Sequence, residues 1–208
     1  AQPVLVPRLA NPILQGDYEH VLPTYRAYSL VASMTDYLLY PLLRTLSCLD
    51  IRRPAEPVAA LSPALLQDLA QHDVWETDVA RGGVDIWMTC TSVHEERRLC
   101  QVPVPALYQD LSESGFEQHF YQCVGTLFHL FGIYRKHWRA MNCPPHTTIW
   151  LDGDEETPCL NGLSAESLLG AAQHGMSKQR RRWHTILTNK NLATIQSVAA
   201  NPYQELLT

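Results

Sequence analysis

Apolar residues recur at helical spacing in two long stretches of the chain. From Pro23 to Leu49, apolar side chains return every three or four residues, which predicts a helix that Pro41 kinks or divides. A second, longer helix is predicted from about Phe116 to Met141. Its apolar residues cover most of the circumference between Phe120 and Ile133, which is typical of a central, buried helix.

Between these helices the pattern changes to short runs that are rich in β-branched and aromatic residues. Residues 74–80, 84–92 and 96–102 are separated by R-G-G and V-H-E, so they predict a small three-stranded antiparallel β-meander. A short helix precedes them, because Ser62 can cap a helix whose first residue is Pro63. Together these elements predict an α+β fold that is mostly α.

The acidic loop G-D-E-E-T-P indicates a boundary between a helical body, residues 1–157, and a C-terminal module, residues 158–208. Three short helices are predicted in this module: Ser164 to about His174, Ser177 to about Thr188, and Asn191 to about Ala200. Gly175 supplies a left-handed residue that closes the first helix, and Ser177 caps the second. The first two helices are therefore expected to cross at a tight turn.

The composition is that of a folded protein without a membrane span. Of the 208 residues, 46% are hydrophobic and 18% are charged. The sequence contains no run of about 18 consecutive apolar residues, so no membrane partner is expected. The N-terminal sequence A-Q-P-V-L-V-P-R is not an intact signal peptide, which favours a cytoplasmic location, although removal of a secretion signal would leave the same sequence.

The cysteines and histidines give little support to a metal site. The six cysteines contain no C-x-x-C, which favours free thiols, and Cys90 and Cys100 are the pair that the predicted meander would place opposite each other. His119 and Cys123 are one helical turn apart, but tetrahedral zinc needs four converging ligands. The acidic residues around Asp154 lack the spacing of a calcium loop. We therefore expect no metal and no cofactor.

The net charge of −5 is unevenly distributed along the chain. From Ser164 to Thr208 five cations stand against two anions, a local charge of +3, which leaves −8 on the other residues. Four of the cations fall between Ser177 and Trp183, on the predicted first turn of a helix, where the helix dipole disfavours positive charge. A polyanion outside the protein would compensate this cost.

The same region resembles the bacterial helix-turn-helix motif. In that motif a small residue lies four positions before a turn glycine, and the glycine is followed by an aliphatic residue and by Ser or Thr. Ala171, Gly175, Met176 and Ser177 occupy these positions here. The resemblance implies that the second helix lies in the major groove of DNA, with its N-terminal residues at the base edges.

The nucleic-acid-binding residues that this resemblance implies are Ser177, Lys178, Gln179, Arg180, Arg181, Arg182, His184 and Lys190. Their types suit the role, because arginine can bind guanine and glutamine can bind adenine. One position departs from the motif, which has an aliphatic residue where this chain has Arg181. Trp183 is expected to take over that packing role in a shifted register.

The leading hypothesis is a DNA-binding protein, either a transcriptional regulator or a subunit of a nucleoprotein assembly, with double-stranded DNA favoured over RNA. The body would then mediate homo-oligomer or protein contacts. The first alternative is a protein-interaction or structural subunit whose basic helix docks on an acidic partner surface. An enzyme with a dispersed or metal-dependent site comes last, because the sequence has no G-x-S-x-G, P-loop, G-x-G-x-x-G or H-E-x-x-H.

Overall fold

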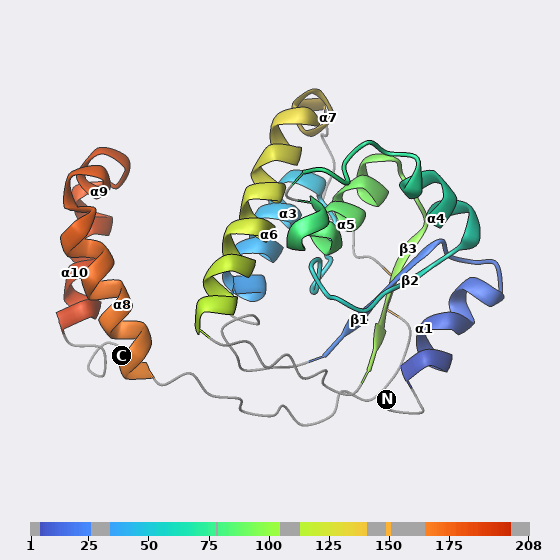
Figure 1. Cartoon of the computed structure of the whole chain (residues 1–208), viewed down its shortest axis with the longest axis horizontal. Helices are drawn as coiled ribbons and strands as arrows, with labels where there is room; N and C mark the ends of the chain where they lie inside the picture. The colour runs from blue at the N-terminus through green and yellow to red at the C-terminus, as the bar shows by residue number, and fades with distance from the viewer. Residues whose placement is uncertain are drawn as a thin grey trace. The chain divides into compact units, whose positions relative to one another are not determined.

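The chain forms two compact units, Ala1–Asn161 and Gly162–Thr208, which we describe in turn. The computed structural model describes residues 5–25, 34–77, 79–104, 113–140, 149–150 and 165–200 (Figure 1). The predicted boundary between residues 157 and 158 lies outside these ranges. Helices dominate the described residues and short strands form one sheet, so the predicted fold class, α+β and mostly α, is confirmed.

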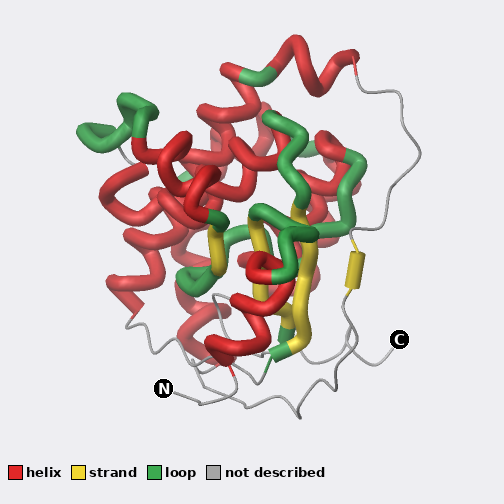
Figure 2. The backbone as a smooth tube through the Cα atoms, turned by 90° about the vertical axis from the view of Figure 1, so that its right-hand side faces the viewer, coloured by secondary structure: helices red, strands yellow, loops and turns green. Residues whose placement is uncertain are grey.

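The sheet is mixed, with its strands in the order β2-β1-β3-β4 (Figure 2). These strands are β1 (His20–Thr24), β2 (Ala60–Leu61), β3 (Leu99–Pro103) and β4 (Ile149–Trp150). β1 and β3 are parallel along their whole length, from His20 opposite Leu99 to Thr24 opposite Pro103. β2 pairs antiparallel with β1, and β4 pairs parallel with β3. Every residue of β1 is buried, as expected for an inner strand that is covered on both faces.

The predicted antiparallel meander is wrong. Residues 74–77 of the first predicted strand form turns and residues 79–80 begin the π-helical η2 (Val79–Gly83), while the second predicted strand lies within helix α5 (Val84–His94). Only the last predicted strand exists, as β3, and its inner neighbour is the parallel β1. α5 is buried around most of its circumference. Its buried residues are Ile86, Trp87, Thr89, Cys90, Thr91, Ser92 and Val93. Because α5 is buried on most sides, its sequence lacks the amphipathic period of a surface helix. Its composition, rich in β-branched and aromatic residues, therefore predicted a strand where the chain forms a helix.

Helices surround this sheet. They include α1 (Leu5–Leu14), η1 (Thr35–Leu39), α3 (Tyr40–Ser47), α4 (Pro63–Ala70), α6 (Glu113–Ile133) and α7 (Arg135–Ala140). The helix predicted from Pro23 to Leu49 is confirmed only in its second half, where the π-helical η1 runs directly into α3, and Pro23 and Thr24 belong to β1. Residues 26–33 of this prediction lie outside the described ranges. Pro41 lies in the first turn of α3. The predicted cap of α4 is confirmed, since the Leu65 N–H donates to the Ser62 hydroxyl at 3.2 Å.

Helices cover both faces of the sheet (Figure 1). On one face Val21 packs in a cluster with Leu9 of α1. Leu22, the next residue of β1, belongs to the larger cluster that contains Ile86 of α5 and Leu127 of α6. Successive side chains of a strand point to opposite faces, so β1 joins the two halves of the hydrophobic core.

Helix α6 lies at the surface of the body, so the prediction of a central, buried helix is wrong. One face enters the core through Cys123, Leu127 and Leu130. On the other face Tyr121 is 67% exposed and Phe128 is 55% exposed. The apolar residues that suggested burial on all sides therefore include an exposed aromatic set. No helix in the ranges given above combines the length and apolarity needed to cross a membrane.

In residues 165–200 of the C-terminal unit the chain forms three helices, α8 (Ala165–Lys178), α9 (Arg180–Ile186) and α10 (Asn189–Ala200). α8 and α10 lie side by side in Figure 1, and the Gln173 side chain on α8 donates to the Ala199 carbonyl on α10 at 2.7 Å. Thr188 caps α10, because its hydroxyl accepts from the Asn191 N–H at 3.2 Å.

Candidate functional site

The predicted site residues are spread over the three C-terminal helices. Ser177 and Lys178 end α8, Gln179 separates α8 from α9, Arg180, Arg181, Arg182 and His184 lie on α9, and Lys190 lies in the first turn of α10. Gln179 is half-buried and the other seven are exposed. The structure therefore presents most of the predicted site to solvent.

The predicted turn at Gly175 is wrong, and with it the helix-turn-helix geometry. α8 continues through Gly175 to Lys178, and the Gln179 N–H donates to the Gly175 carbonyl at 2.9 Å, as in a helix. Ser177 caps no helix, because its hydroxyl donates back to the His174 carbonyl at 2.8 Å. A glycine is favoured just after a helix but also fits inside one, at a cost of about 1 kcal/mol relative to alanine. The break comes four residues later, at Gln179, with φ −109° and ψ 16°.

The arginines of α9 form one exposed arc. Successive helical residues are about 100° apart, so Arg180, Arg181 and Arg182 span about 200° of the circumference. The next residue, Trp183, is half-buried, whereas Arg181 is exposed. The packing role expected of Trp183 stays a prediction. We call Arg180, Arg181 and Arg182 the arginine arc.

These cations have few carboxylates near them in the chain. Among the residues that the structure describes, no ion pair involves Lys178, Lys190 or any residue of the arginine arc. The one acidic residue of α8, Glu166, is twelve positions before Lys178, or about 18 Å along the helix axis. Within the described part of the chain, no carboxylate forms an ion pair with these cations.

The body holds a buried polar cluster that the sequence analysis missed. Tyr25, just after the carboxyl end of β1, donates a short hydrogen bond from its hydroxyl to Glu56. Arg53 donates to the Tyr25 carbonyl at 3.2 Å from Nε and at 3.1 Å from Nη2. The same guanidinium lies 3.7 Å from the Asp36 carboxylate and 4.0 Å from that of Glu56. These residues are far apart in the chain, and the only local signal was the Arg53 and Glu56 pair at i, i+3.

Burial and neighbouring charge shift the pKa values of carboxyl groups in and beside this cluster. Burial raises the pKa of Glu56 to about 7, and the nearby Asp85 and Asp36 add to the rise. Burial also raises the pKa of Asp85 to about 6. A carboxyl group that titrates near neutral pH suits general acid–base chemistry. Glu56 is only 4% exposed and is held by Tyr25 and Arg53, so its geometry is that of an anchor for the loop that precedes β2.

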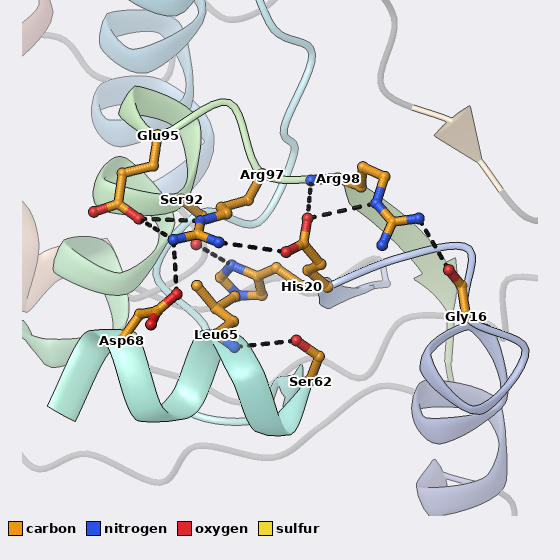
Figure 3. Close-up of polar contacts among 10 residues, drawn as sticks. Gly16, His20, Ser62, Leu65, Asp68, Ser92, Glu95, Arg97 and Arg98 are labelled. Carbon is orange, nitrogen blue, oxygen red and sulfur yellow. Dashed lines mark hydrogen bonds and ion pairs between the residues drawn. The ribbon is translucent and has the colours of Figure 1, made fainter.

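A second network joins the amino ends of β1 and β3 (Figure 3). Arg97 pairs with Glu95 and Asp68 at 2.9 Å each and with Glu19 at 3.5 Å. Arg98 adds a bond to the Gly16 carbonyl at 2.9 Å, at the end of α1. This network connects α1, α4, α5 and β3, so we assign it a structural role.

His20 and Ser92 form a buried pair below that network (Figure 3). His20 Nδ1 lies 2.9 Å from the Ser92 hydroxyl, and burial lowers the pKa of His20 to about 4. Neither residue is accessible to solvent. A histidine and a serine without access to a substrate cannot act as a nucleophilic pair, so we interpret this contact as a neutral hydrogen bond between β1 and α5.

The four cysteines in the described ranges, and the His119 and Cys123 pair, show no metal geometry. Cys48, Cys90, Cys100 and Cys123 are free thiols, and Cys90 lies on α5, which removes the strand pairing predicted to place it opposite Cys100. Cys123 Sγ is 3.6 Å from His119 Nε2. Burial raises the pKa of the Cys123 thiol to about 12, which keeps it protonated and a poor ligand. Within the described ranges, no three His, Cys, Asp or Glu side chains converge as a cation site.

Comparisons with protein families, curated proteins and solved structures found no match for this chain. Among the described residues, the arginine arc is an exposed cationic feature whose chemistry indicates an anionic ligand.

Proposed function

We propose that the C-terminal unit binds nucleic acid through its phosphate groups. The observation that supports this proposal is the arginine arc, which is exposed and makes no ion pair with the residues that the structure describes. A guanidinium group donates two parallel N–H bonds to the oxygens of a phosphate or a carboxylate, so the arginine arc suits a phosphate ligand, and the high negative charge density of nucleic acid favours it over an isolated carboxylate.

The remaining charges of the chain favour the same ligand at the same place. Lys178 and Lys190 add two exposed cations to the unit that carries the arginine arc. The other residues carry a net −8, so they repel a polyanion and leave the C-terminal unit as the attractive part. Phosphate contacts position a protein on nucleic acid without reading its sequence. We therefore expect binding that tolerates many sequences.

The test is a titration of the full chain with duplex and single-stranded oligonucleotides at several salt concentrations. Each phosphate contact contributes about 0.9 to the slope of log affinity against log salt for duplex DNA, and about 0.7 for single strands. Replacing all three arginines of the arc with alanine should flatten the slope by roughly two to three units. The triple lysine variant keeps the charge and should keep most of the slope.

Matched controls distinguish an effect of the arginine arc from an effect of the net charge of the protein. Arg180→Ala with Arg182→Ala is compared with Arg135→Ala and Arg139→Ala, two exposed arginines of α7. Only the first pair should flatten the salt dependence. The proposal is wrong if the triple-alanine variant keeps the slope of the wild type, or if both pairs change it equally. Competition by polyglutamate and not by nucleic acid would favour an acidic protein partner instead.

A further inference from the structure

Two histidines meet where α7 lies against the end of α5. His94 is in the last turn of α5, and His137 is in the short helix α7 that follows α6 (Figure 1). Their ring centroids are 4.7 Å apart, with the ring planes at 78° to each other. His94 also stacks on Tyr134, whose ring centroid is 3.8 Å away at an interplanar angle of 22°. The two imidazoles are therefore in contact inside a small aromatic cluster.

This cluster buries ring nitrogens that have no hydrogen-bond partner. Nδ1 of His94, Nε2 of His137 and Nε1 of Trp138 are buried, and none of them has a partner among the described residues. A neutral imidazole carries its hydrogen on one nitrogen, so its buried nitrogen can stay without a hydrogen. A charged imidazole carries a hydrogen on both nitrogens, which would leave a buried donor without an acceptor, at a cost in free energy. The packed arrangement therefore suits the neutral form of both rings.

The helix that carries His137 is strongly cationic. α7 has three permanently positive residues and no acidic residue. The positive residues are Arg135, Lys136 and Arg139. None of them forms an ion pair with the described residues. A proton on His137 would therefore add a fourth positive charge to a helix that has no negative charge of its own.

Glu95 is the carboxylate that acts on His94 from the same end of α5. It favours the charged form of His94, but its carboxylate also pairs with Arg97 at 2.9 Å. His72 lies 3.5 Å from the same carboxylate, and a charged His72 would compete with His94 for it. Glu95 therefore offsets only part of the cost of charging His94.

Two further titratable groups near His94 stay uncharged at neutral pH. Burial raises the pKa of Tyr134, and burial raises the pKa of Cys90, one turn earlier on α5, to about 12. For His94 itself, burial lowers the pKa, and the neighbouring His137 lowers it further. The docked position of α7 therefore disfavours a proton at this contact.

We propose that His94 and His137 form a proton-sensitive latch, which holds α7 against the body while both rings are neutral and releases it when they become charged. Rings that are released into water take up protons near the ordinary pKa of histidine, about 6.5, whereas the docked His94 takes up its proton only at lower pH. The released state therefore binds more protons below about pH 6.5, and docking of α7 weakens as the pH falls through that value. This inference uses only residues of the body and does not depend on nucleic-acid binding.

Hydrogen exchange of the full chain at about pH 8 and about pH 5.5, corrected for the intrinsic effect of pH on exchange, tests the latch. Each histidine that stays neutral in docked α7 should raise the opening constant of α7 about tenfold at the lower pH. Peptides of α7 in the wild type should therefore lose between about tenfold and about a hundredfold in protection. Peptides of β1 in the same samples report on the rest of the body and should lose less. Equal losses in the two sets of peptides would overturn the proposal.

The variant that preserves the rings is His94→Phe with His137→Phe, because phenylalanine keeps the aromatic contacts and cannot be protonated. Protection of α7 in this double variant should be the same at both pH values. His129→Phe is the matched control, at an exposed histidine of α6, and should keep the acid-induced loss of the wild type. His72→Gln changes the other neighbour of Glu95 and should keep most of that loss. A double variant that loses protection in acid as the wild type does would rule out the latch.

Titration of the imidazole protons by nuclear magnetic resonance tests the contact even if the double variant does not fold. In the wild type, proton uptake by His94 and the loss of α7 protection should occur at the same pH. His137→Gln should raise the pKa of His94, because it removes the positive charge beside that ring. His129→Gln should leave that pKa unchanged. Proton uptake by His94 while α7 stays protected, or the same His94 pKa with and without His137, would overturn the proposal.

Discussion

Adjacent arginines occur in both units of the protein, but in contrasting surroundings. In the body, Arg53 is buried against Tyr25 and Glu56, and Arg97 pairs with three carboxylates. In the C-terminal unit, the arginine arc is exposed and without an ion-pair partner among the described residues. The same residue type thus forms ion pairs that hold the body together, whereas in the C-terminal unit it is exposed to solvent.

The contrast follows from the carboxylates that the fold brings to each arginine. The body is acidic, and loops from distant parts of the chain converge on Arg53 and Arg97. A pair of adjacent arginines in a sequence is therefore no evidence for an anion site by itself. What distinguishes the arginine arc is its exposure together with the absence of acidic neighbours along α9.

The largest expected difference is in stability after loss of one arginine. Above pH 7, where Glu56 is ionised, Arg53→Ala leaves the Glu56 carboxylate and the Tyr25 carbonyl without their partner in a buried site, so we expect a loss of about 3–5 kcal/mol in the free energy of unfolding. Arg181→Ala should change it by less than about 0.5 kcal/mol, because Arg181 is exposed. Denaturant unfolding of the full chain measures both values. Similar losses for the two variants would show that Arg53 and Arg181 contribute equally to the stability of the fold, which would contradict this prediction.

The buried cluster should also make the stability of the body depend on pH. The folded state keeps Glu56 protonated up to a pKa of about 7, whereas the unfolded chain releases this proton near the ordinary value of 4.5. The folded state therefore binds more protons between these values, and the free energy of unfolding falls as pH rises through that window. His20 acts in the opposite direction, because its pKa falls to about 4 in the folded state.

Comparison of Glu56→Gln with the wild type isolates the contribution of Glu56 from that of His20. The variant should gain stability relative to the wild type between pH 4.5 and about 7, by on the order of 3 kcal/mol at most. Hydrogen exchange measured separately for peptides of β1 and of α10 shows which unit changes in stability with pH. Only the peptides of β1 should show a pH-dependent difference between the variant and the wild type. Glu76→Gln, at an exposed carboxylate, serves as the control. A flat difference across this pH range would show that Glu56 is ionised in the fold.

The sequence predicted features that depend on nearby residues and failed where distant contacts decide. The cap at Ser62 was predictable because Ser62 and Leu65 are neighbours in the chain. The identity of α5 was not, since its burial comes from β1 and α6, which are far away in sequence. The exposure of the arginine arc could be inferred from its charge, whereas the pairing of Arg53 with Asp36 and Glu56 required the folded chain.

The smallest expected effect distinguishes a continuous α8 from the predicted turn. Gly175 lies inside α8 with open space around it, so Gly175→Ala should stabilise the C-terminal unit by up to about 1 kcal/mol. A left-handed turn at Gly175 would reverse the sign, because a side chain is strained there. Gly16 provides the internal standard, since its φ of 82° is left-handed and Gly16→Ala should destabilise the body by about 1 kcal/mol. Hydrogen exchange of α8 and α1 peptides reports the two signs in one experiment. If both substitutions destabilised their helices, α8 would not be continuous at Gly175.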